Sequence, residues 1–174
     1  MTAIDCANKR FLIVDSIKQS MDTLKLFSYK LGAEYVDTCY NSKNVVSMCE
    51  AVSYDVIFLG YDLGDHKKNG QQILEELRVN NYIDRHCIVI LITAEVSQSM
   101  VLAALEHKPD HYLCKPYTLN DLEKRLKDCL HKKREMAAIY EALDENMPFQ
   151  VIEHCKEALT SNNRFKAECL GIMS

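Results

Sequence analysis

The fold of this chain is decided by a stretch that reads Tyr54-Asp55-Val56-Ile57-Phe58-Leu59-Gly60-Tyr61-Asp62-Leu63-Gly64-Asp65. Its first half, residues 55–60, is a short apolar run in which polar and apolar residues do not alternate, and turn residues close it. Such a run is typical of a strand that is buried on both faces of a sheet. In an open parallel sheet, functional side chains lie just beyond the carboxyl ends of the strands. Gly60 and Asp62 are therefore the first positions at which we expect a site.

Four more segments with the character of short strands surround this stretch. They are residues 10–15, 35–40, 86–92 and 111–114. Between and after them, apolar residues recur every three or four positions, which predicts amphipathic helices. These segments are residues 16–31, 42–52, 71–79, 97–106 and 118–130. Five alternations of strand and helix predict an α/β fold, a parallel sheet covered by helices on both faces with right-handed crossovers.

Local signals mark several helix starts and turns. Ser42 is expected to cap the helix over residues 42–52, because serine favours that position. Thr118 and Asp121 resemble a capping box in which Asp replaces Glu. Asn69 and Gly70 are turn signals that precede the helix over residues 71–79.

The pattern changes after residue 130. Helical spacing continues to residue 143, and Pro148 stands at the expected first position of another helix. A third helical segment starts near Phe165. We therefore expect a doubly wound domain over residues 1–130 and a helical hairpin extension over residues 131–174. The extension is too short to bury its own apolar face, as in one unit of a helical array, so we expect the chain to be truncated.

The composition argues against several classes of protein. The chain has 174 residues, of which 48% are hydrophobic and 26% charged, as in a globular domain. A formal net charge of −4 argues against a nucleic-acid surface. No apolar run is long enough to cross a bilayer, and the N-terminus is too polar for a signal peptide. We expect a cytoplasmic protein without nucleic-acid or membrane partners.

The eight cysteines do not form a recognisable framework. None belongs to a C-x-x-C pair, and several lie inside apolar runs, where cysteine behaves as a small hydrophobic residue. Without a secretion signal, free thiols in a reducing compartment are expected. A metal–thiolate site needs clustered Cys and His with short spacing; the closest candidate, His111 with Cys114, lies in a strand-like run, so we do not expect such a site.

Four motifs occur in a fixed order along the first 130 residues. They are Phe11-Leu12-Ile13-Val14-Asp15, Asp55-Val56-Ile57-Phe58-Leu59, Leu91-Ile92-Thr93-Ala94 and Tyr112-Leu113-Cys114-Lys115-Pro116-Tyr117. In this order and spacing they resemble the receiver domain of bacterial response regulators, the CheY-like, flavodoxin-like module of two-component phosphorelay signal transduction. Residues 60–64 and 69–77 are similar to a subgroup in which tetratricopeptide-like helices follow the receiver, and residues 139–144 and 153–155 are similar to the start of those helices. The resemblance implies a five-stranded parallel sheet with strand order 2-1-3-4-5.

The resemblance also implies a pocket. In that family a phosphoryl group passes from a histidine kinase to an aspartate, while Mg²⁺ and an ammonium group neutralise its charge. The matching positions are Asp15 and Ser16 for the acidic pair, Gly60 for the phosphoacceptor, Thr93 for the hydroxyl, Lys115 for the ammonium and Tyr112 for the switch aromatic. A cis peptide bond before Pro116 is implied as well.

Two of these positions depart from the family's pattern. Gly60 has no nucleophile, and Ser16 is a poor Mg²⁺ ligand compared with a carboxylate. Asp62 offers an alternative, because two residues along a continued strand it would point to the same side as residue 60. Its separation from Gly70 also equals the family's usual separation of acceptor and glycine. The loop therefore has either an insertion or a displaced acceptor, and of the two we favour the insertion.

Two further alternatives stay open at the pocket. Thr93 and Lys115 are either relics that satisfy local hydrogen bonds or a retained anion-binding pair. Tyr112 is either packed against the domain or a working switch. Without a metal ion, Lys115 should form an ion pair with Asp15 or Asp62.

The sequence therefore predicts a degenerate pseudo-receiver that acts as a protein–protein interaction module, without enzyme activity and without a cofactor. The alternative is an active phosphoacceptor receiver that uses Asp62, with Mg²⁺ held weakly by Asp15 and Asp62. The expected partners are a histidine kinase or other signalling proteins, and a homodimer is a further option. The resemblance implies that they bind the face formed by residues 97–106, 111–114 and 118–130, and the C-terminal helices are a further expected binding surface.

Overall fold

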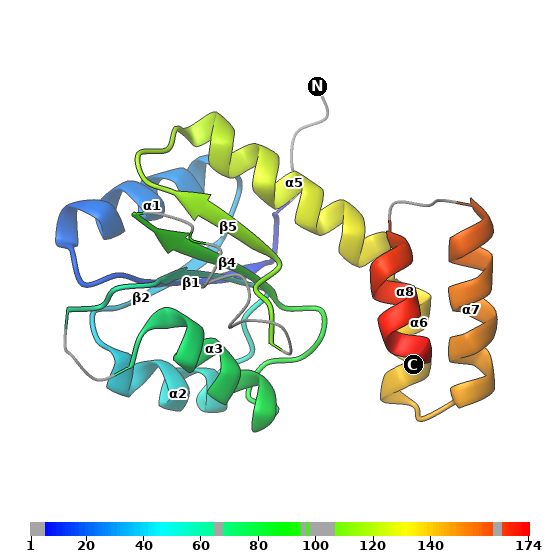
Figure 1. Cartoon of the computed structure of the whole chain (residues 1–174). Helices are drawn as coiled ribbons and strands as arrows, with labels where there is room; N and C mark the ends of the chain where they lie inside the picture. The colour runs from blue at the N-terminus through cyan, green and yellow to red at the C-terminus, as the bar shows by residue number, and fades with distance from the viewer. Residues whose placement is uncertain (1–5, 65–67, 95–96, 98–106, 162–164) are drawn as a thin grey trace. The chain divides into compact units, whose positions relative to one another are not determined.

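The structure is a computed structural model that describes residues 6–64, 68–94, 97, 107–161 and 165–174 (Figure 1). The chain forms two compact units, Met1–Lys127 and Asp128–Ser174. The division lies within one helix, α5 (Leu119–Glu135), close to the boundary that the sequence pattern predicts after residue 130.

The first unit contains a five-stranded parallel sheet. Its strands are β1 (Arg10–Val14), β2 (Tyr35–Cys39), β3 (Val56–Gly60), β4 (Ile88–Thr93) and β5 (His111–Cys114). They lie in the order β2-β1-β3-β4-β5, which confirms the predicted fold class and strand order. The chain therefore winds outward in both directions from the neighbours β1 and β3, and this reversal places a crevice at their carboxyl ends.

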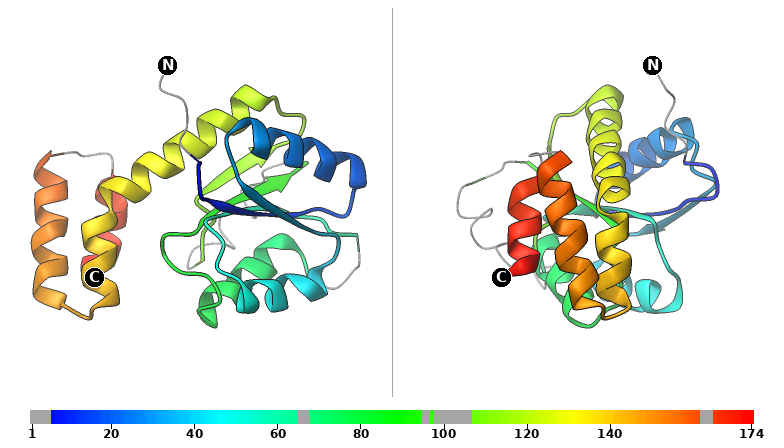
Figure 2. Two further views of the ribbon diagram at one scale, coloured as in Figure 1. Left: turned by 180° about the vertical axis from the view of Figure 1, so that it is seen from behind. Right: turned by 90° about the vertical axis from the view of Figure 1, so that its right-hand side faces the viewer.

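Helices cover both faces of this sheet. The helices α1 (Lys18–Lys30) and α5 lie on one face, and α2 (Ser42–Ala51) and α3 (Gly70–Val79) lie on the other (Figures 1 and 2). The predicted helix over residues 97–106 falls outside the described residues, apart from Ser97.

Side chains cap three of these helices. The prediction that Ser42 caps α2 is wrong, because Asn41 takes that position and its side chain accepts a hydrogen bond from the Asn44 backbone at 3.2 Å. Ser42 is the first helical residue. At the start of α5, the predicted capping box is confirmed. The Asp121 carboxylate accepts hydrogen bonds from the backbone and the hydroxyl of Thr118, both at 2.8 Å.

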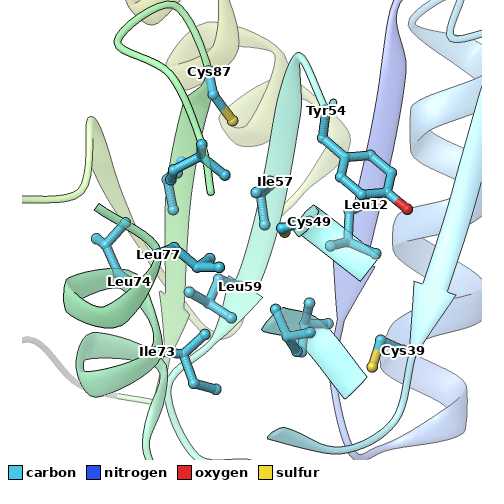
Figure 3. Packing of buried hydrophobic residues seen from close by; sticks show 14 of the residues in the cluster. Leu12, Cys39, Cys49, Tyr54, Ile57, Leu59, Ile73, Leu74, Leu77 and Cys87 are labelled. Atoms are coloured by element: carbon cyan, nitrogen blue, oxygen red, sulfur yellow. The ribbon is translucent and has the colours of Figure 1, made fainter. Parts of the chain in front are cut away.

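The hydrophobic core of the first unit is built around β3. Its residues from Val56 to Leu59 are fully buried, which agrees with the continuous apolar run in the sequence. On one face, Phe58 meets Phe11 of β1 edge to face, with ring centroids 5.7 Å apart. On the other, side chains of the sheet pack against α2 and α3 (Figure 3). Burial of one such side chain contributes about 1.5–3 kcal/mol to folding, so β3 is held firmly in its register.

The second unit is helical. It contains α6 (Ala137–Asp144), α7 (Pro148–Ser161) and α8 (Lys166–Met173), and Pro148 is the first residue of α7, as predicted. Seven buried residues form a small core: Met136, Ile139, Ala142, Val151, Cys155, Phe165 and Cys169. The helices therefore bury more of their own apolar surface than the sequence pattern predicts. No described helix in either unit is long and apolar enough to cross a membrane.

Large apolar side chains also remain at the surface of the second unit. Phe149 is 87% exposed, and Ile152 and Leu170 are 40% and 47% exposed. An apolar side chain as exposed as Phe149 gains nothing from folding of this unit alone.

Candidate functional site

The predicted pocket residues gather at the carboxyl edge of the sheet. Asp15 follows β1, Gly60 ends β3, Thr93 ends β4 and Lys115 follows β5. The strand register brings them together, because Gly60 pairs with Ile92 of β4, next to Thr93. Residues that lie 100 positions apart in the chain thus share one small region.

Asp15 is the centre of a hydrogen-bond network. Its side chain is 3% exposed. One carboxylate oxygen accepts a hydrogen bond from the backbone of Ile17 at 2.8 Å. The other accepts from the Ser20 hydroxyl at 2.6 Å and from the Lys115 ammonium at 3.1 Å. A buried carboxylate is stable when it is paired and hydrogen-bonded in this way, so the protein itself satisfies this charge.

The ion pair between Lys115 and Asp15 confirms one of the two pairings predicted for a pocket without metal. The Lys115 side chain is 34% exposed, so water reaches one side of it. Its position is set by the chain itself. The Lys115 backbone donates to the Thr93 carbonyl at 2.8 Å, and the peptide bond to Pro116 is cis, as the motif implies.

Ser20 and Tyr117 extend this network. The Tyr117 hydroxyl is hydrogen-bonded to Ser20, and burial raises the pKa of Tyr117, so it stays neutral near pH 7. A continuous path of polar contacts therefore runs from Tyr117 through Ser20 and Asp15 to Lys115. The sequence motifs did not indicate Ser20. The only available signal was a small polar residue one turn inside the helix that follows Asp15.

Gly60 lies against the first residue of α3, Gly70. A Cβ atom at Gly70, the first residue of that helix, would lie 2.3 Å from the Gly60 carbonyl oxygen. Real atoms do not approach so closely, so only glycine fits at residue 70. The Gly70 backbone also donates to the Tyr61 carbonyl at 2.8 Å. The first residue of α3 therefore lies in contact with the last residue of β3 and is hydrogen-bonded to the residue that follows it.

Asp62 lies in that connection and has a local role. Its side chain is exposed, and one carboxylate oxygen accepts a hydrogen bond from the Gly64 backbone at 2.9 Å. Gly64 has a φ of +68°, a conformation that glycine adopts without strain. Among the described residues, the ion pair of Lys115 is with Asp15 and not with Asp62.

We compared the chain with models of known protein families. The model of the response regulator receiver domain matches residues 11–127. The chain belongs to the response regulator receiver family. The match spans all five strands except Arg10, the first residue of β1, and the part of α5 in the first unit, so the fold and the family agree over nearly the same residues.

Individual relatives share the receiver fold at low identity. The alkaline phosphatase synthesis transcriptional regulatory protein PhoP of Bacillus subtilis is 23% identical over 145 residues, which are 83% of this chain and 58% of that protein. The chain thus spans little more than half of that relative. A two-component response regulator from Clostridium difficile is 28% identical, with a TM-score of 0.62 and coverage of 71% of this chain and 97% of that chain.

A third relative has a metal in its pocket. The receiver domain of the sensor histidine kinase PA1611 from Pseudomonas aeruginosa is 22% identical, with a TM-score of 0.61 and coverage of 72% of this chain and 99% of that chain. Its structure has a magnesium ion coordinated in the active site cleft. At this identity the likeness shows the fold alone.

The residues of this receiver do not fit a magnesium site of that kind. Mg²⁺ sites are built on one or two carboxylates and several waters. Ser16 and Gly60 supply no carboxylate, and both oxygens of Asp15 already accept hydrogen bonds from the protein. In the described part of the chain, no group of three acidic, Cys or His side chains is placed to hold a metal ion.

The remaining two pocket positions of the receiver differ in their surroundings. Thr93 is 5% exposed at the end of β4. Tyr112 is half-buried against the core of the first unit, and burial raises its pKa. Its hydroxyl oxygen is buried without a hydrogen-bond partner among the described residues. The ring is thus packed inward, and the two alternatives considered for Tyr112 both stay open.

Proposed function

We propose that this receiver domain is degenerate: it acts in two-component signalling by binding other proteins and does not accept a phosphoryl group at residue 60. One observation carries the proposal. β3 ends in Gly60, in register with β4, at the place where the resemblance puts the reactive carboxylate. The ammonium that would hold the phosphoryl group is instead paired with Asp15.

The chemistry of phosphoryl transfer supports this proposal. Transfer to a carboxylate needs a positioned nucleophile and cations that neutralise the developing charge. Gly60 offers no nucleophile, and Lys115 could reach a phosphoryl group only if its pair with Asp15 were broken. The domain would therefore have neither enzyme activity nor a metal cofactor.

Asp62 is the basis of the competing proposal, an active phosphoacceptor with Mg²⁺. Its carboxylate is exposed, which favours access by a phosphodonor. However, one of its oxygens is committed to the Gly64 backbone. It thus supports the turn, and we rank this function second.

The binding surfaces follow from the same proposal. A histidine kinase or another signalling protein, or a second copy of the chain, would dock on the face that includes β5 and α5. The three short helices of the second unit would be tetratricopeptide-like and would offer exposed apolar side chains such as Phe149 and Ile152 to a partner. A cytoplasmic location would suit these roles.

Phosphorylation assays test this proposal. The whole chain is incubated with Mg²⁺ and either acetyl phosphate or beryllofluoride, and products are followed by intact mass and ¹⁹F NMR. We expect neither a phosphoryl adduct nor bound fluoride resonances. An adduct that disappears in Asp62→Asn but persists in Asp22→Asn, which changes an exposed carboxylate on α1, would establish the Asp62 function instead.

A further inference from the structure

The turn between α6 and α7 carries exposed apolar side chains. We call residues 141–153 the α6–α7 tip, and Figure 1 shows this turn at one end of the second unit. Phe149 and Ile152 lie three residues apart on α7, so their side chains are neighbours on the surface of the helix. Phe149 is the most exposed large apolar residue of the described chain, at 87%. Burial of these side chains against a partner would be favourable.

The exposure of Phe149 is a property of the folded second unit. Val151 and Cys155, which lie four residues apart on a different side of α7, are buried in the core of that unit. The turn before α7 is hydrogen-bonded, because the Met147 backbone donates to the Ala142 carbonyl at 2.9 Å. α7 is therefore held with one apolar side in the core and Phe149 directed to solvent.

The charged residues of the α6–α7 tip are all acidic and exposed: Glu141, Asp144, Glu145 and Glu153. The first lysine or arginine that follows along α7 is Lys156, beyond the tip. Glu153 lies four residues from Phe149, so these two side chains are also neighbours on the helix. The ion pairs between described side chains involve neither Glu145 nor Glu153. Carboxylates without a basic neighbour in an ion pair therefore border the exposed apolar side chains.

This combination indicates the chemistry of the partner. Aromatic residues are enriched at the centres of interfaces, where a polar rim surrounds them. Charges on the rim favour a partner of opposite sign, because like charges across an interface repel each other. A second copy of the chain that met this tip symmetrically would bring carboxylates against carboxylates. A segment with Lys or Arg beside apolar side chains fits better, since the stems of these basic residues also cover apolar surface.

We infer that the α6–α7 tip is a docking surface for a basic amphipathic segment of a partner protein, with Phe149 as its apolar anchor. The inference rests on the proposed function, in which the domain acts by binding other proteins, and it names the chemistry of one such partner. Apolar side chains of the partner would cover Phe149 and Ile152. Its Lys or Arg side chains would pair with carboxylates of the tip such as Glu153.

Binding of a defined peptide tests the anchor. The probe is a fluorescein-labelled amphipathic helix of leucine and lysine residues, titrated with the whole chain and followed by fluorescence anisotropy. We expect Phe149→Ala to weaken binding about tenfold or more, as truncation of an aromatic hot-spot residue does. Leu26→Ala changes an exposed apolar residue of α1 and should leave the affinity unchanged. Equal effects of the two substitutions, or no binding of the peptide, would overturn the docking surface.

A pair of double variants tests the charges. Glu145→Gln/Glu153→Gln removes two carboxylates from the tip, and Glu34→Gln/Glu50→Gln removes two exposed carboxylates from the first unit, so the net charge changes equally. We expect the first pair to weaken peptide binding several-fold more than the second at low salt. The difference should shrink at high salt, because salt screens exposed charges. Equal losses in both variants, or equally tight binding of a peptide with glutamate in place of lysine, would contradict the inference.

The mass of the chain in solution tests the other possible occupant, a second copy. Light scattering after size-exclusion chromatography compares the wild type with Phe149→Ala, and we expect the same mass for both. Their unfolding midpoints should also agree, because a side chain as exposed as Phe149 contributes little to folding. A wild-type dimer that Phe149→Ala dissociates would show that a second copy covers Phe149, and it would overturn the basic partner.

These results separate the docking surface from the proposed function. Phosphorylation of the wild-type chain at Asp62 would refute the degenerate function, yet it would leave peptide binding at the α6–α7 tip as measured. Peptide binding that does not depend on Phe149 would refute the docking surface and leave the loss of phosphorylation at residue 60 standing.

Discussion

At the scale of single residues, the arrangement of the pocket depends on the hydrogen bonds that the Asp15 carboxylate accepts. Its nearly buried carboxylate has three donors, from Ile17, Ser20 and Lys115. A partly buried ion pair gains net stability only when further hydrogen bonds offset the loss of hydration. Here the backbone and the serine hydroxyl provide them, so Lys115 has become a structural partner of Asp15.

Removal of the ammonium should destabilise the first unit. Lys115→Ala leaves the Asp15 charge with two neutral donors, and we expect a loss of roughly 1–3 kcal/mol, the usual cost of leaving a buried polar group without a partner. The value should lie at the lower end, because 34% of the Lys115 side chain is exposed and water can replace part of the contact. Urea denaturation followed by circular dichroism measures the change.

A second lysine serves as the control for this prediction. Lys43 is exposed on α2, and Lys43→Ala should change the stability by no more than about 0.5 kcal/mol, as surface substitutions usually do. Similar losses for both variants would mean that the Lys115 pair contributes nothing specific.

The sequence predicted this pair but not the burial of Leu63. Lys115 and Asp15 each follow an apolar strand, and parallel strands bring their carboxyl ends to one edge, so their meeting follows from the pattern. Leu63 stands between loop residues, and its inward direction depends on the turn that Asp62 and Gly64 form. No periodicity encodes that direction, so the sequence alone could not reveal it.

At the scale of elements, the start of α3 fixes the far end of the pocket loop. Asn69 and Gln72 form a capping box: the Asn69 side chain accepts from the Gln72 backbone at 2.9 Å, and the Gln72 side chain accepts from the Asn69 backbone at 3.0 Å. Gly70 then allows the helix to approach β3. The sequence indicated a turn at these residues, and the structure shows that the turn is also the first turn of the helix.

Loss of this cap should weaken α3. Asn69→Ala removes the acceptor for an otherwise unpaired backbone amide, and such substitutions typically cost about 1 kcal/mol. Urea denaturation of the variant measures the effect. Asn44→Ala on α2 changes an exposed asparagine whose backbone amide, not its side chain, makes the capping hydrogen bond. If the cost at residue 69 were no larger than at residue 44, the capping box would not contribute to stability.

At the scale of the whole molecule, the chain has two cores of different origin. The alternation of strands and helices was sufficient to predict the first, because a buried parallel sheet requires continuous apolar strands. The second core was underestimated, since the three helices and the residues that precede them bury seven side chains although α8 is only weakly amphipathic. Packing of short helices depends on their connections, which the sequence pattern does not specify.

Buried cysteines lie in both cores, so the reactivity of their thiols shows whether each core stays closed. Only Cys114 is exposed, and the other seven of the eight are buried. Burial raises the pKa of Cys49 to about 12 and that of Cys155 to about 11, so these thiols stay protonated near neutral pH. The thiolate is the reactive form, so we expect a single thiol of the native protein to react rapidly with Ellman's reagent.

Unfolding and one substitution check this prediction. All eight thiols should react once the chain is denatured, and Cys114→Ser should abolish the rapid phase of the native protein. Rapid labelling of a further thiol in that variant would mean that one of the two cores opens readily.

The ion pair of Asp15 and Lys115 has a consequence for how a cell could use such a domain. Under the proposed function residue 60 accepts no phosphoryl group, so phosphorylation at that position does not switch the domain. Occupancy of its partner would then follow mass action, set by the abundance of each protein and their affinity. A change in the amount of the chain would then be one way to change that occupancy.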